Sequence, residues 1–308
     1  MIGDRTSEGV SLRLPLPQPS FGNAIADYNM IEAGDKVAAY AQLREIQARG
    51  GRGDWPETSL ADWLLTQITG SARIGFDPWL HTVAQIETLE TVLRDSGISL
   101  VAIDKNPVDR IWQDQPDAPT APATEQPLEN AGESHTDKRM RLAATLAKIG
   151  ATSTLLTQPD SIAWLLNIRG ADIPRNPIAH GFALLHADAS LDLFMDPVKL
   201  ETLNAHLGDA VRVHAPDMLR TTLRALDGPG LLDKTTTPVI LAETLSKANC
   251  KILWGTDVCL LPKARKNSTE IAGTRAAHLR DGAAVCDFLA WFDENATSDI
   301  TEIDVVRK

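Results

Sequence analysis

The sequence has few cysteines, no long apolar run and no excess of basic residues. Its three cysteines, Cys250, Cys259 and Cys286, lie nine and then twenty-seven residues apart. Because this spacing fits neither a disulfide framework nor a zinc pattern, we expect small, buried, reduced thiols. No apolar stretch approaches the roughly 18 to 20 residues that cross a bilayer, and the N-terminus has no apolar signal-peptide centre. We therefore expect a cytoplasmic protein with no membrane partner.

Positive charge is scarce. Thirty Lys and Arg residues against 41 Asp and Glu give a net charge of −11. Nucleic acids and anionic membrane surfaces need clustered basic residues, so neither is expected as a partner. The one local basic run, residues 263–268, is interpreted as a solvated connector.

Two kinds of active-site motif are also missing. There is no G-x-S-x-G nucleophile elbow and no glycine-rich phosphate loop, and the Gly-Pro-Gly at 228–230 is interpreted as a turn. The chain is otherwise ordinary, with 43% hydrophobic and 23% charged residues and a mean hydropathy of −0.14. Its length of 308 residues favours two or more domains.

Strand-like and helix-like segments alternate, which predicts an α/β fold. We expect helices at about 37–46, 58–69, 82–96, 134–150, 159–167, 198–207, 217–226 and 268–296, with another beginning near 299. We expect strands at about 71–78, 98–103, 151–157, 180–188, 191–196, 210–215 and 238–242. The short turn at 188–190 predicts a hairpin and therefore a mixed sheet.

A Pro-rich stretch and changes in the helix and strand pattern predict the domain boundaries. Residues 1–110 are interpreted as an incomplete first α/β domain, and 111–132 as a Pro-rich linker lying extended on the surface. Residues 133–260 are interpreted as a second α/β domain. Residues 261–308 then hold one long helix and the start of another, which we interpret as the opening of a third, truncated domain.

Five stretches carry a resemblance to a known family. They are GFDPWLHT (75–82), DKNPVDRIWQDQP (104–116), LTQPDSIAWLLNIRGADIPRNP (156–177), LFMDPVKL (193–200) and KARKNSTEIAGTRAAHLRDGAAVCDFLAWFDE (263–294). With them the sequence resembles the aminopeptidase P family, the three-domain Xaa-Pro aminopeptidases. The match covers most of the chain from about residue 70 onward, while residues 1–60 show no counterpart of the family's opening motif.

This resemblance implies two creatinase N-terminal-type domains, the first of them incomplete here, followed by the opening helices of a pita-bread metallopeptidase domain. It implies removal of the N-terminal residue from peptides with proline in second position, by two divalent metal ions, usually manganese, that activate a hydroxide. It also implies a homodimer.

The family's five metal ligands, two Asp, one His and two Glu, would follow Lys308, so we assign no catalytic residue and no metal ligand in this chain. We accordingly expect a fragment that is inactive alone. A non-catalytic binding or dimerisation module of the same fold remains the alternative. A creatinase-type amidinohydrolase is a third possibility, disfavoured by the central and C-terminal stretches.

The irregular segment 167–177 is the candidate for recognition. Arg169, Asp172 and Asn176 stand on a loop after an apolar helix, and such loops on a rigid domain often bind ligands. These side chains are candidates for the rim of the substrate site. The competing interpretation is a structural Arg–Asp pair that holds the turn.

Other polar clusters favour ordinary roles. His180 and His186 are expected on one face of one strand, but only Asp188 lies close by, too few ligands for a zinc site. The carboxylates at 293–304 fit the preference of helix N-termini for acidic residues.

Overall fold

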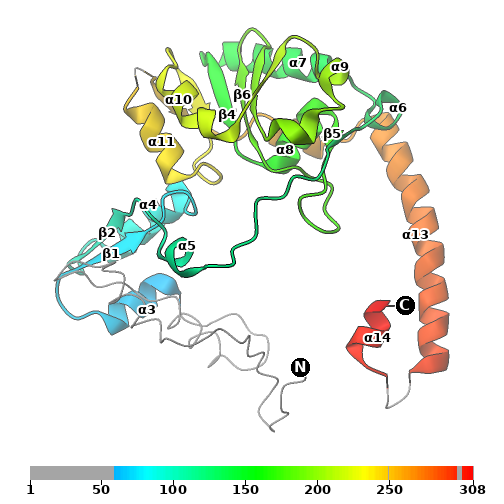
Figure 1. Cartoon of the computed structure of the whole chain (residues 1–308), viewed down its shortest axis with the longest axis horizontal. Coiled ribbons are helices and arrows are strands. Elements are labelled where there is room, and N and C mark those ends of the chain that lie inside the picture. The colour runs from blue at the N-terminus through cyan, green and yellow to red at the C-terminus, as the bar shows by residue number, and fades with distance from the viewer. Residues whose placement is uncertain (1–58, 249, 297–299, 308) are drawn as a thin grey trace. The chain divides into compact units, whose positions relative to one another are not determined.

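The structure is a computed structural model that describes residues 59–248, 250–296 and 300–307. The described residues form two compact units (Figure 1), the first made of residues 59–118 and 233–248, the second of residues 119–232, 250–296 and 300–307. Residues 233–248 thus pack with the first unit, whereas the sequence assigned them to a continuous domain at 133–260. The helix expected at 37–46 lies outside the described residues.

A parallel pair of strands organises the first unit. β1 (Ala72–Phe76) pairs with β2 (Ile98–Ala102), and α3 (Leu60–Gln67) and α4 (Val83–Leu93) occur where the sequence predicts them. The buried side chains of this cluster are Leu64, Ile74, Leu93 and Ile98. Thr82 and Gln85 form a capping box that starts α4. A short helix, α5 (Pro107–Ile111), follows β2.

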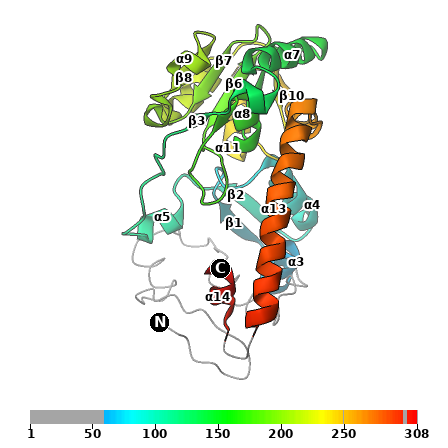
Figure 2. The ribbon, with the colours of Figure 1, turned by 90° about the vertical axis from the view of Figure 1, so that its right-hand side faces the viewer.

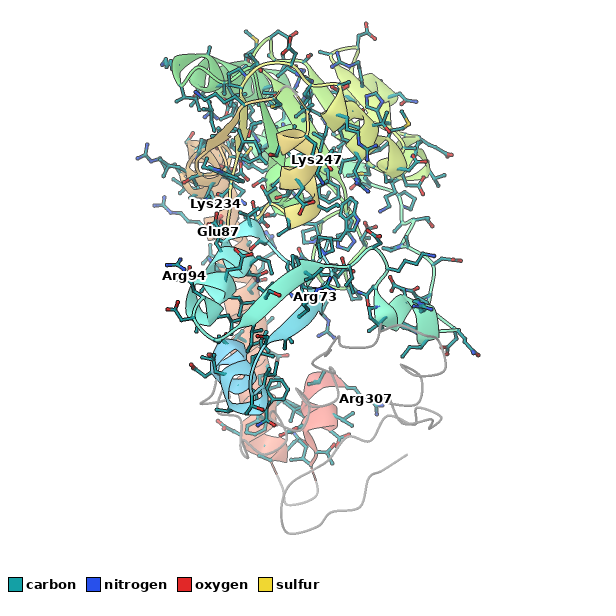
Figure 3. All side chains as sticks on the ribbon, turned by 90° about the vertical axis from the view of Figure 1, so that its left-hand side faces the viewer. Arg73, Glu87, Arg94, Lys234, Lys247 and Arg307 are labelled. Carbon is teal, nitrogen blue, oxygen red and sulfur yellow. The ribbon has the colours of Figure 1, made fainter. Side chains whose placement is uncertain are left out.

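The strand predicted at 238–242 is wrong, because these residues begin helix α11 (Val239–Ser246). The pattern of a short apolar run is compatible with both a buried strand and a buried helix. Here, contacts with residues distant in the sequence decide between the two. The amide of Val239 donates to His81 O at 3.0 Å, and Lys234 Nζ lies 2.6 Å from Glu87 Oε1 on α4 (Figure 3).

The second unit is built on a six-stranded mixed sheet in the order β10-β9-β4-β6-β7-β8. The strands are β4 (Ser153–Leu156), β6 (Phe182–His186), β7 (Leu191–Phe194), β8 (Val211–His214), β9 (Gly230–Leu232) and β10 (Ile252–Trp254). The predicted hairpin is confirmed, since β6 and β7 pair antiparallel. Strands β9 and β10 were not predicted, because three residues are too few to show a periodicity.

Two helices cover one face of this sheet. α7 (His135–Lys148) begins at the Ser134 cap that the sequence predicted, and α8 (Pro159–Leu166) begins with a proline in its first turn. The core between them and the sheet includes Leu142, Leu146, Leu156, Ile162, Leu165, Leu166, Leu185, Leu191 and Leu193. After β8 along the chain, α10 (Leu219–Arg224) follows a 3-10 turn, η2 (Pro216–Met218).

One prediction about this unit is wrong, and another, the surface linker at 111–132, holds for most of its residues. The helix expected at 198–207 is a 3-10 turn, η1 (Pro197–Leu200), and a separate short helix, α9 (Asn204–Leu207). The linker expected to lie on the surface joins the core from Ala123, which is fully buried and donates its amide to Lys199 O. β3 (Thr124–Glu125) then pairs with β5 (Ile168–Arg169), and α6 (Leu128–Ala131) follows.

A long helix follows the sheet of the second unit along the chain. After α12 (Leu260–Ala264), α13 (Ser268–Asn295) runs as one continuous helix (Figure 2), as predicted, and α14 (Glu302–Arg307) follows. No residue of α13 is buried, and Ile271, Leu279, Val285 and Leu289 expose apolar side chains. None of the helices in the described ranges is long and apolar enough to cross a membrane.

We predict that Leu146→Ala lowers the free energy of unfolding by ~2–5 kcal/mol, because Leu146 is fully buried and a cavity would remain. Met140→Ala on the same helix is the control. Met140 is 59% exposed, so its change should stay within about 0.5 kcal/mol. Urea unfolding of both variants measures the difference, and equal effects would contradict the assigned core.

Candidate functional site

The loop between α8 and β6 carries the three residues singled out by the sequence. Asn167 ends α8 in the left-handed conformation, with φ at 51°. Its side-chain amide donates to Glu133 O at 2.9 Å, which holds this unfavourable backbone in place. A Cβ on Gly170 would lie 2.4 Å from Ala179 N, so only glycine fits there.

Asp172 anchors this loop from inside. Its fully buried carboxylate accepts from Lys199 Nζ at 2.6 Å and from the amide of His180 at 2.6 Å. Lys199 is itself only 5% exposed. The Arg–Asp pair suggested as the structural alternative does not form, because Asp172 pairs with Lys199 instead of Arg169. The partner was not evident from sequence, since it comes from the 3-10 turn η1.

Arg169 and Asn176 lie in different surroundings. Asn176 is exposed at the tip, in a turn where its amide donates to Ile173 O and Arg175 adopts a φ of 66°. Arg169 is half-buried, and its Nη1 donates to Ile168 O at 2.8 Å. Of the three candidates, Arg169 alone lines the cavity described next. The structure therefore does not bring the three side chains together.

That cavity, which we call the α6–α13 pocket, lies within the second unit and has a volume of about 710 Å³. Its lining comes from α6, α7, α8, β5 and the first turns of α13, and includes Lys138, Trp164, Asn167, Arg169, Lys266 and Glu270. Lys138 was not singled out from the sequence. Only its position pointed to burial, since Lys138 lies four residues before Leu142 on the apolar face of the predicted helix.

Lys138 is the unusual member of this wall. It is 2% exposed, its Nζ donates to Trp164 O and Asn167 Oδ1, and it lies 4.4 Å from the centre of the Trp164 ring. Burial lowers the pKa of Lys138 to about 8, although Glu270 and Glu133 oppose the change. Burial also lowers the pKa of Arg169.

A second polar cluster surrounds Asp192 on β7. Arg212 binds its two oxygens at 2.7 and 2.9 Å, and the Nε2 atoms of His186 and His214 each lie 2.7 Å away. Burial alone would raise the pKa of Asp192, but the hydrogen bonds from Arg212, His186 and His214 outweigh it and lower the pKa. His180 falls outside β6, so the expected same-strand pair with His186 is wrong.

The described residues offer no set of ligands for a metal ion. No group of three or more His, Cys, Asp or Glu side chains in the described ranges is arranged to hold an ion. Around Asp192 the Arg212 guanidinium already occupies both carboxylate oxygens. Cys250 and Cys259 are buried free thiols as predicted, whereas Cys286 is exposed. Burial raises the pKa of the Cys259 thiol, which keeps it protonated.

We predict that Asp172→Asn lowers the free energy of unfolding by ~3–5 kcal/mol, because it leaves the buried Lys199 ammonium without its counter-charge. Asn176→Ala at the exposed tip of the same loop should change it by about 0.5 kcal/mol or less. A double-mutant cycle with Lys199→Met, followed by chemical unfolding, isolates the pair. A coupling energy near zero would show that the two charges do not interact.

We predict that the Asp192 cluster loses its contribution in acid. A carboxylate with a lowered folded pKa stabilises the fold above its unfolded pKa of ~3.9, and this contribution falls away as the pH drops towards the folded value. Asp192→Asn should therefore destabilise strongly at pH 5 and much less at pH 2.5. Asp209→Asn, at an exposed carboxylate, is the control. A pH-independent difference in urea midpoints would refute the prediction.

Comparison with known proteins places this arrangement in a family. The Creatinase/Prolidase N-terminal domain matches residues 114–270. Relatives named "Probable Xaa-Pro aminopeptidase P" include those of Leptosphaeria maculans, 33% identical over 259 residues (80% of this chain, 43% of the relative), and Aspergillus niger, 33% identical over 256 residues (80% and 42%).

A solved structure agrees with these relatives. The X-prolyl aminopeptidase of Caenorhabditis elegans, a cytosolic enzyme with a di-nuclear active site, superposes with a TM-score of 0.74 at 26% identity, covering 89% of this chain and 48% of that one. The present chain thus spans less than half the length of each of these proteins. From the domain match, the relatives and the shared fold, the chain belongs to the aminopeptidase P family and carries its creatinase/prolidase N-terminal domain.

Proposed function

We propose that this chain serves in an Xaa-Pro aminopeptidase, which releases the N-terminal residue from peptides with proline in second position. The observation that carries the proposal is the relationship to Xaa-Pro aminopeptidases along 80% of the chain. The matching fold of the nematode enzyme supports it. In this proposal the described residues act as scaffold and as part of the substrate surroundings.

Two divalent metal ions would supply the chemistry of peptide hydrolysis, and we propose that they are manganese. The di-nuclear active site of the nematode enzyme supports the number of ions. Since no described residues form a ligand set, we derive no catalytic step in this chain and propose that it does not hydrolyse peptides alone. A cytoplasmic location and a homodimer complete the proposal, the former supported by the cytosolic nematode enzyme.

The predicted division into two creatinase-type domains and a pita-bread opening stays part of this proposal. So does the rim role of the loop with Arg169, Asp172 and Asn176. The buried Asp172–Lys199 pair gives that role a physical form, since a fixed loop can present Arg169 and Asn176 in constant positions. Asp172 itself would act as a positioning residue, because its carboxylate is fully buried.

We predict that the purified chain with Mn²⁺ and Ala-Pro-Ala releases no alanine. A chimera tests the scaffold role: the segment of the nematode enzyme that matches this chain is replaced by the chain's own residues. We expect the chimera to release alanine in Mn²⁺ and to lose that activity in EDTA, as the unmodified nematode enzyme should. Amino-acid analysis of the products is the measurement.

Two outcomes would contradict the proposal. Turnover by the chain alone would show that it holds its own metal centre. A chimera that folds, by circular dichroism and thermal unfolding, yet gives no turnover would favour a non-catalytic binding module instead.

A further inference from the structure

The α6–α13 pocket has a feature that the proposed peptidase function does not explain. Its wall contains two buried or half-buried cations, Lys138 and Arg169, whose polar contacts are to neutral groups. In the part of the chain that the structure describes, no carboxylate lies within 4 Å of either one. Buried charges in proteins are ordinarily paired, so a cation of this kind beside a cavity marks a place for an anion.

Hydrogen-bond capacity points the same way. Lys138 Nζ has three N–H donors and uses two of them, on Trp164 O at 2.9 Å and Asn167 Oδ1 at 2.7 Å. Arg169 has five N–H donors and uses one, on Ile168 O. Both residues line the pocket. Donors therefore remain on two fixed, positively charged side chains that border the same cavity.

The acidic residues of the wall offset these cations only in part. Glu270 attracts both Lys138 and Arg169 electrostatically, but it forms no ion pair with either, and its Oε2 accepts from the Asn267 amide at 2.9 Å in the capping box of α13. Glu129 is exposed on α6. With Lys266, the wall holds three cations against these two carboxylates, an excess of one positive charge.

We propose that the α6–α13 pocket binds the free carboxylate of a ligand the size of an amino acid or a short peptide. One excess positive charge suits a singly charged anion, and the two glutamates oppose a doubly charged one such as phosphate. The Arg169 guanidinium offers the planar fork that matches a carboxylate. Amides of Gln126, Asn130 and Asn167 can meet peptide groups, and the volume of about 710 Å³ lies in the range of small-ligand sites.

The test compares two tripeptides, Ala-Ala-Ala with a free C-terminus and the same peptide as its C-terminal amide. Neither has proline, so the result does not depend on the proposed peptidase activity. Binding to the full chain is followed by Trp164 fluorescence, with Trp164→Phe as the blank, and by calorimetry. We expect the free acid to bind at least ~10-fold more tightly than the amide, since a charge-assisted hydrogen bond contributes ~1.5–3 kcal/mol.

Matched variants locate the site. Arg169→Met and Lys138→Met should each weaken binding of the free acid by ~10-fold or more. Arg175→Met on the same loop and Lys148→Met on the same helix should leave it unchanged, because neither residue lines the pocket. If Lys138→Met does not fold, Arg169→Met decides, since Arg169 is only half-buried.

Three results would overturn the proposal: equal binding of acid and amide, inorganic phosphate binding as tightly as the acid, or binding that Arg169→Met does not weaken. The first would show that the carboxylate is not recognised. The second would show a general anion surface, and the third would place the ligand elsewhere. No detectable binding of the acid at millimolar concentration would likewise refute it.

Discussion

Burial of the sheet of the second unit against α7 and α8 is the constraint on which the rest of that unit depends. Leu146 of α7, Leu166 of α8 and Leu185 of β6 are all fully buried in one cluster. Because α8 must place six successive side chains in the interior, its ends are fixed as well. The loop that leaves α8 at Asn167 therefore starts from a rigid point.

The fixed end of α8 also holds the start of the loop and the neighbouring wall of the pocket in place. Asn167 ends the helix, accepts a hydrogen bond from Lys138 and donates one to Glu133 O. Fourteen residues, 168–181, then lead back to the sheet at β6, and the Asp172–Lys199 pair holds this segment in place. Arg169 and Lys138 consequently line the same cavity, next to groups whose main role is structural. A binding site of this kind needs little reorganisation to receive a charged ligand.

Much of this fold could be predicted from the sequence, because strong local signals agree with the final structure. The Ser134 cap, the left-handed Gly150 after α7 and the hairpin at 188–190 all act over a few residues. Three of the errors share one cause. The run at 238–242 and the three-residue strands β9 and β10 carry too little local information, and distant partners decided their form.

The sequence by itself determined the family, the α/β class, the long helix that begins at Ser268 and the absence of a phosphate loop or nucleophile elbow, since each rests on residue types and spacings. Only the tertiary structure decided that Asp172 meets Lys199, that Asp192 gathers Arg212 and two histidines, and that Lys138 faces the same cavity as Arg169. These partners lie between 6 and 31 positions apart in the chain. Apart from His186 and Asp192, which the local β6–β7 hairpin brings together, side chains so separated meet only when helices and strands pack.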